Sequence, residues 1–139
     1  MQPCPYEIND LLYHTSPMIL IDNIESYDAE TVLSSVEITP NSPFLRDDVV
    51  PSYVSVEYMA QSVAAYSGIK AKNSAGSIKI GYLASARKVE LNVPYFSVGD
   101  KLEITVKMIW NESPMAVFDC RVDRKNTIVA SSRLNVYQP

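Results

Sequence analysis

The chain has 139 residues, of which 47% are hydrophobic and 20% are charged, so it can bury one core and we expect a single domain over residues 1–139. Its formal net charge of −4, without any run of basic residues, argues against nucleic acid as a partner. No apolar run is long enough to span a membrane and the first residues do not form a secretory signal, so we expect a cytoplasmic protein with no membrane partner.

The residues that could bind a metal are few and scattered. The chain has one histidine, His14, and two cysteines, Cys4 and Cys120, whose spacing matches no metal-binding motif. The four glycines are also spread along the chain and form no phosphate-binding loop. We therefore expect no metal, no organic cofactor and two free thiols in a reducing compartment.

The first elements are expected to be a short helix and a hairpin. Tyr6–Leu12 places apolar side chains on one helical face, and the Thr-Ser-Pro run at 15–17 interrupts that pattern. Met18–Asp28 and Thr31–Ile38 then have the composition of two strands joined by a turn.

A long helix is expected after a proline-containing loop over Thr39–Val50. Pro51 and Ser52 mark its start, with Ser52 as the expected cap, and the pattern ends near Ile69. A polar loop covers 70–77. The rest of the chain is strand-like, over Ile78–Leu91, Lys101–Asn111, Pro114–Arg124 and Thr127–Tyr137.

This order of elements predicts the α+β class, with an antiparallel sheet wrapped around one long helix. The helix is apolar on most sides, and such a helix must be covered by other elements. A single sheet cannot enclose a helix completely, so we expect a second subunit to cover what remains.

The long helix carries one acidic residue, Glu57, with Gln61 one turn later. A carboxylate in a buried helix is costly unless it is paired, hydrogen-bonded or used in chemistry. Glu57 is therefore the first candidate for a functional residue. The structural alternative is a buried acid that backbone N–H groups or Arg87 satisfy.

Three stretches resemble the hot-dog-fold 3-hydroxyacyl-acyl-carrier-protein dehydratases. Leu11–Ile24, LLYHTSPMILIDNI, is similar to that family's helix end, His-x-x-Pro turn and first strand. Pro51–Gln61, PSYVSVEYMAQ, resembles its central-helix motif, Pro-Gly-x-x-x-x-Glu-x-x-x-Gln. Gly81–Leu102, GYLASARKVELNVPYFSVGDKL, resembles the strand, proline and Gly-Asp turn that follow. The most similar subgroup is the dehydratases of aryl-polyene biosynthetic clusters.

The resemblance implies a hot-dog fold and a dimer whose two sheets join edge to edge, with sites at the interface built from both subunits. It implies dehydration of a 3-hydroxyacyl thioester on an acyl carrier protein to a trans-2-enoyl thioester, in fatty-acid or polyene biosynthesis. The expected assembly is a homodimer or higher homo-oligomer, with a heteromer of related subunits as the alternative.

The reaction needs a base at C2, an acid for the departing C3 hydroxyl and a donor that polarises the thioester carbonyl. The resemblance gives Glu57 the role of the catalytic carboxylate and makes Gln61 its helper. Ser52 stands where the motif has glycine, and the backbone N–H groups of Ser52 and Tyr53 are the expected contacts of the thioester.

The chain departs from the family upstream of the helix. The usual Gly-His-Phe motif, whose histidine is catalytic, is replaced by Ser-Pro-Phe at 42–44, and Pro43 cannot transfer a proton. Either His14 has taken the histidine's role, or the chain is a weak or inactive partner of a related subunit. We favour the first, with His14 as base and Glu57 as acid, from opposite subunits or from one.

Two other functions stay open beside the dehydratase. A hot-dog thioesterase also uses a carboxylate near the central helix, to activate water. A non-catalytic subunit would complete the site of a related chain, and the loss of the histidine at Pro43 motivates that alternative.

Overall fold

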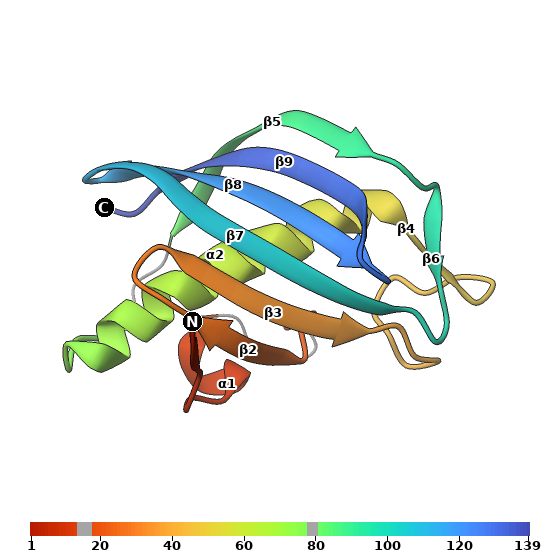
Figure 1. The fold of residues 1–139 in the computed structure, drawn as a ribbon, viewed down its shortest axis with the longest axis horizontal. Helices are drawn as coiled ribbons and strands as arrows, with labels where there is room; N and C mark the ends of the chain where they lie inside the picture. The colour runs from red at the N-terminus through yellow and green to blue at the C-terminus, as the bar shows by residue number, and fades with distance from the viewer. Residues whose placement is uncertain (14–17, 78–80) are drawn as a thin grey trace.

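The structure is a computed structural model and describes residues 1–13, 18–77 and 81–139. A seven-stranded antiparallel sheet curves around one long helix, α2 (Figure 1), which confirms the predicted α+β arrangement. Its strand order is β1-β2-β3-β7-β8-β9-β5, and β4 and β6 form a separate pair. The strands are β1 Gln2–Pro3, β2 Asn23–Tyr27, β3 Thr31–Glu37, β4 Val49–Pro51, β5 Tyr82–Leu91, β6 Tyr95–Ser97, β7 Lys101–Glu112, β8 Met115–Arg124 and β9 Thr127–Tyr137.

The long strands β7, β8 and β9 form the meander that the sequence predicts. Burial alternates along β8, where Phe118, Cys120 and Val122 are buried and the residues between them are exposed. The β8–β9 turn places Lys125 and Asn126 at φ values of 51° and 62°. Positive φ at both central residues is typical of a type I′ hairpin turn, which matches the twist of the flanking strands.

The central helix begins with a turn of 3-10 helix, η1 (Ser52–Val54), and continues as α2 (Ser55–Asn73). The prediction that Ser52 caps the helix is wrong, because no side-chain hydrogen bond caps η1 or α2. The helix also ends at Asn73 instead of near Ile69. Lys70 and Lys72 extend it as good helix formers that carry positive charge at its C-terminal end.

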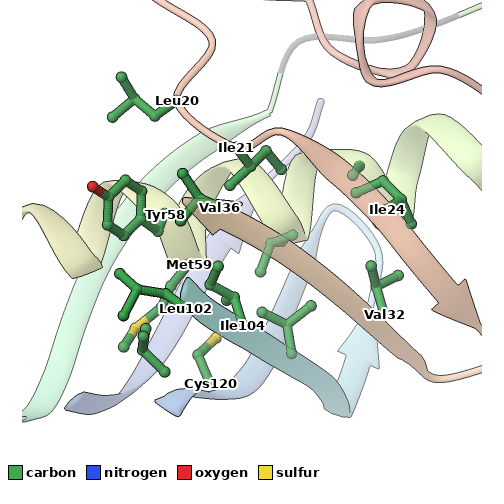
Figure 2. Packing of buried hydrophobic residues seen from close by; sticks show 14 of the residues in the cluster. Leu20, Ile21, Ile24, Val32, Val36, Tyr58, Met59, Leu102, Ile104 and Cys120 are labelled. Carbon is green, nitrogen blue, oxygen red and sulfur yellow. The ribbon is translucent and has the colours of Figure 1, made fainter. Parts of the chain in front are cut away.

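The core lies between α2 and the sheet. Met59 of α2 and Leu102 and Ile104 of β7 are fully buried there (Figure 2). Each such side chain contributes about 1.5–3 kcal/mol when it is removed from water. One buried polar contact joins the layers, since Ser34 of β3 and Ser62 of α2 lie 2.6 Å apart at their Oγ atoms.

The short helix α1 (Ile8–Leu11) packs against α2 at a glycine. A Cβ atom at Gly68 would collide with the backbone carbonyl of Leu11. The absence of a side chain at this position therefore sets how closely α1 approaches the central helix.

Two predicted strands differ from the structure at their starts. The strand predicted over Met18–Asp28 begins as β2 at Asn23, and the backbone of Met18 and Leu20 bonds to the Gln61 side chain. The strand predicted from Ile78 is described from Tyr82, and 78–80 lie outside the described residues. The three shortest strands, β1, β4 and β6, were not predicted, because two or three residues carry no period.

Candidate active site

Glu57 lies in the first turn of α2 with its side chain half-buried. It forms part of the wall of a cavity of about 240 Å³ between α2, the start of β5 and the end of β9. The other lining residues are Ala60, Val63, Ala64, Ser67, Gly81, Tyr82, Leu83, Val136 and Gln138. The rest of the lining is largely apolar, which suits an alkyl or alkenyl chain more than a charged ligand.

A second cavity, of about 450 Å³, lies next to the first towards the C-terminal end of α2. The two cavities share Ser67, Val136 and Gln138. Ala60 and Ala64 lie one turn apart on the helix face that borders the first cavity, and small side chains there leave the space beside the helix open. A bound chain could thus extend from Glu57 along the helix.

Gln61 is fully buried and makes three hydrogen bonds. Its Nε2 donates to Oε1 of Glu57 over 3.1 Å and to the carbonyl oxygen of Met18 over 2.7 Å. Its Oε1 accepts the N–H of Leu20 over 2.8 Å. The predicted pairing of Gln61 with Glu57 is present, and the same amide also binds the chain that precedes β2.

The two expected backbone donors, the N–H groups of Ser52 and Tyr53, differ in their availability to a ligand. The N–H of Ser52 donates to the carbonyl oxygen of Pro94 over 3.1 Å, and the Ser52 side chain is buried, so its amide is already engaged. Tyr53 is 67% exposed and lies in the first helical turn. The first N–H groups of a helix have no intrahelical acceptor, which leaves the Tyr53 amide as the better placed of the two donors.

His14, the predicted base, lies outside the described residues. The chain on both sides of 14–17 is described and contacts α2. Leu11 packs on Gly68 before it, and Met18 and Leu20 bind Gln61 after it. Both flanks of the segment that contains His14 are therefore anchored to the helix that carries Glu57.

Comparison with known proteins identifies the family of the chain. The model of the ApeP-like family, described as ApeP dehydratase, matches residues 6–139. The chain belongs to the ApeP-like dehydratase family. The predicted dehydratase activity and the predicted hot-dog dehydratase family are confirmed by this match.

Curated relatives of this ApeP-like dehydratase include 3-hydroxyacyl-[acyl-carrier-protein] dehydratases FabZ. The FabZ of Bartonella quintana is 28% identical over 134 residues, which cover 92% of this chain and 84% of the relative. The FabZ of Streptococcus pneumoniae is 25% identical over 133 residues, which cover 92% of each protein.

Solved structures agree with the family match. A chain of the dehydratase heterocomplex ApeI:P from Xenorhabdus doucetiae superposes with a TM-score of 0.93 and 27% identity, over 98% of this chain and 93% of that chain. A hypothetical thioesterase from Streptococcus pneumoniae, solved with coenzyme A, superposes with a TM-score of 0.66 and 11% identity, over 84% of each chain. The thioesterase likeness shows the shared fold alone.

No cationic side chain in the part of the chain that the structure describes forms a salt bridge with Glu57. Among the described residues, the salt bridges join Arg121 to Asp123, Arg124 to Asp100 and Arg133 to Asp119. Arg87 is exposed and its carbonyl oxygen accepts a hydrogen bond from Ser132. The neutral amide of Gln61, and not a cation, is thus the partner that the structure gives Glu57.

Other titratable groups near the helix are shielded from water. Burial, with a smaller contribution from the charge of Asp22, raises the pKa of Tyr58 to about 12. Burial also raises the pKa of the Cys120 thiol, and both Cys4 and Cys120 are free.

Within the described ranges, no three His, Cys, Asp or Glu side chains gather closely enough to hold a metal ion. None of the helices in the described part of the chain is long and apolar enough to cross a membrane.

Sequence reasoning missed the parts of the site that come from distant segments. Val136 and Gln138 border the cavity from the end of β9, and Met18 and Leu20 contribute only backbone atoms. No local pattern marks these positions, because their role depends on which strand ends beside α2.

Proposed function

We propose that this ApeP-like dehydratase removes water from a 3-hydroxyacyl thioester on an acyl carrier protein and forms the trans-2-enoyl thioester. The observation that carries the proposal is the Glu57 carboxylate on the wall of a largely apolar cavity beside α2, with a second cavity next to it. The FabZ relatives, which are named for this substrate, support it. The reaction belongs to fatty-acid or polyene biosynthesis, in the cytoplasm.

In the proposed mechanism His14 removes a proton from C2 of the substrate. The electron pair of that C–H bond forms the C2=C3 double bond, and the C3–O bond breaks. Glu57 donates its proton to the departing hydroxyl, which leaves as water. Each proton transfer by a positioned side chain of this kind typically raises the rate by about 10²–10⁴-fold.

The thioester carbonyl needs a hydrogen-bond donor as negative charge builds on its oxygen. The Tyr53 N–H takes this role in the proposal, since the Ser52 N–H already donates to Pro94. Removing one donor of this kind typically costs about 10²–10³-fold in kcat. The acyl chain beyond C3 would lie along Ala60 and Ala64 in the cavity beside α2.

The product identifies the reaction directly. The purified chain is incubated with a 3-hydroxyacyl carrier-protein thioester while the absorbance of a conjugated enoyl product and the release of free thiol are followed. We expect enoyl absorbance without thiol release. Free thiol instead would assign the chain to the thioesterases.

Two single substitutions test the residue roles. His14→Ala and Glu57→Gln are each expected to lower enoyl formation by at least about 10²-fold, because each removes one proton-transfer group. Circular dichroism of each variant checks that the fold is kept. Wild-type turnover in both variants would contradict the assignment.

A non-catalytic subunit is the second candidate. Pro43 in place of the usual histidine favours it, and a solved relative is described as part of the ApeI:P heterocomplex. This chain would then assemble with a related subunit and show no activity when purified alone. Native mass spectrometry would reveal a heteromer, and activity of the homo-oligomer would remove this candidate.

A further inference from the structure

A cavity of about 440 Å³ hollows the face of the sheet that is turned away from α2. Side chains alternate along β8, so Asp119 and Arg121 point away from the core and line this cavity. Phe118 and Val122, on either side of them, are buried in the core with α2. The sheet therefore separates the cavity from the helix that carries Glu57 (Figure 1), and the proposed reaction makes no use of it.

Short hydroxyl side chains explain why the sheet is hollow here. Thr105 of β7 and Ser131 of β9 lie on either side of Arg121 of β8 in one cross-strand row. Both residues are half-buried and both line the cavity. Each hydroxyl is able to donate a hydrogen bond to a ligand that enters between the longer side chains.

Charged side chains surround these hydroxyls. Those that line the cavity are Lys88, Lys107, Arg121, Arg133, Glu90 and Asp119. Four are cationic and two are acidic, so the lining is net positive in a chain whose formal net charge is −4. A local reversal of this kind attracts anions to one place on an otherwise acidic protein.

The arginines of the lining are held by carboxylates, whereas the lysines are not. Nε of Arg133 lies 2.8 Å from Oδ1 of Asp119, and Nε of Arg121 lies 3.2 Å from Oδ1 of Asp123. In the part of the chain that the structure describes, no salt bridge involves either lysine of the lining. Those two ammonium groups are therefore free to pair with a bound anion.

Lys88 reaches the cavity from a β-bulge. The register between β5 and β9 shifts between Arg87 and Glu90, and Lys88 has a φ of 53°. Arg87 pairs with Arg133, which points away from the core, so regular alternation would turn Lys88 towards α2. The bulge turns it to the cavity instead, at a backbone cost of about 1–2 kcal/mol for the left-handed conformation.

We propose that this cavity binds a small molecule that carries a diphosphate group. Lys88 on β5 and Lys107 on β7 are three strand spacings apart, which is about 14 Å between backbones at about 4.8 Å a spacing. Two long side chains that reach inwards over this span contact the two ends of a diphosphate, whereas a single phosphate is too small for both. Ile128, which is 45% exposed, adds an apolar lining residue for the rest of the ligand. The cavity volume is typical of small-molecule sites.

Titration of the purified chain with sodium pyrophosphate tests the site without any assay of activity. Amide chemical shifts are followed by NMR at neutral pH and constant ionic strength. We expect saturable shifts at Thr105, Arg121 and Ser131, with inorganic phosphate and acetate each binding at least about tenfold more weakly. No saturable shift at these amides, or equal affinity for acetate or phosphate, would overturn the proposal.

Lys107→Gln and Lys101→Gln form a matched pair of variants. Both lysines are exposed on the same face of β7, but Lys101 does not line the cavity. We expect Lys107→Gln to weaken pyrophosphate binding about 5–10-fold and Lys101→Gln to leave it unchanged. Equal effects of the two changes would reduce the binding to general surface charge and overturn the proposal.

Glu90→Gln gives a test of opposite sign. Glu90 lines the cavity and, among the described residues, takes part in no salt bridge. Removing its charge should tighten pyrophosphate binding by a few-fold, because it repels the anion. Weaker binding in Glu90→Gln than in the wild type would contradict an anion site at this place.

Discussion

At the scale of single residues, Glu57 combines a half-buried position on a cavity wall with a neutral hydrogen-bond partner. A cation such as Arg87 would hold the carboxylate ionised, and full burial without a partner would be costly. The Gln61 amide fixes the carboxylate in place without putting a charge beside it. That combination is suited to acid–base chemistry.

Tyr58, the neighbour of Glu57, provides a pH-dependent test of how well this part of the helix is shielded from water. Its pKa is raised from 10.0 to about 12, chiefly by burial, so the folded state holds the proton more tightly than the unfolded state. The stability that this provides is fully present below pH 10 and is lost as the pH rises towards 12.

We therefore expect Tyr58→Phe to resist alkaline unfolding better than the wild type. Between neutral pH and about pH 11, the free energy of unfolding of the wild type should fall by about 1 kcal/mol more than that of Tyr58→Phe. Urea unfolding at neutral and alkaline pH measures the difference. Identical alkaline losses for the two proteins would show that Tyr58 is not shielded from water.

The i to i+4 pairing of Glu57 with Gln61 could be predicted from the sequence, because helix geometry alone brings such residues together. The bonds from Gln61 to Met18 and Leu20 could not be, since those partners lie more than 40 positions away. The hydrogen bond from the Ser52 N–H to the Pro94 carbonyl could not be predicted for the same reason.

At the scale of elements, α2 organises the site. It carries Glu57 and Gln61, borders both cavities, and anchors the chain on each side of 14–17. Its apolar character all round made the long helix and the sheet around it predictable. The short strands β4 and β6 were not, because Val49–Pro51 and Tyr95–Ser97 lie in segments with turn residues and pair with each other outside the main sheet.

The packing of α1 on α2 gives a prediction at this scale. Gly68→Ala places a Cβ atom against the Leu11 carbonyl, so α1 must shift, and we expect a loss of about 1–3 kcal/mol in the free energy of unfolding. Because Leu11 leads towards His14, enoyl formation should fall as well. Urea unfolding and turnover are measured on the same sample.

Gly76→Ala is the control for this change. A Cβ atom at Gly76 meets its nearest atoms at 3.6 Å, which is ordinary contact, so stability should stay the same or rise by about 0.5 kcal/mol. Equal effects at Gly68 and Gly76 would show that the close approach of Leu11 does not constrain the fold.

At the scale of the whole molecule, β5 is the longer of the two edge strands of the sheet, the other being β1. Within the described chain it pairs on one side only, with β9, and Tyr82, Leu83, Val89 and Leu91 are between 41% and 55% exposed. A long apolar edge of this kind pairs readily with another chain. The site residues at the start of β5 would then lie next to the partner, whether it is a second copy or a related subunit.

We expect Val89→Asp to weaken this assembly, because it puts a charge on the apolar edge. Ile109→Asp is the control, since Ile109 is 42% exposed but belongs to β7, inside the sheet order. Native mass spectrometry at several concentrations should show smaller species for Val89→Asp alone. The same mass distribution for both variants and the wild type would rule out β5 as the assembly edge.

The central claim is that Glu57 is the acid of a dehydratase, and the single-turnover rate of enoyl formation tests it most directly. Glu57→Gln keeps the shape and removes the acidic proton, whereas Glu25→Gln changes an exposed acid on β2 that binds Ser35. We predict that Glu57→Gln lowers the rate by at least about 10²-fold and that Glu25→Gln leaves it unchanged. A Glu57→Gln chain that forms enoyl product at the wild-type rate would contradict the account.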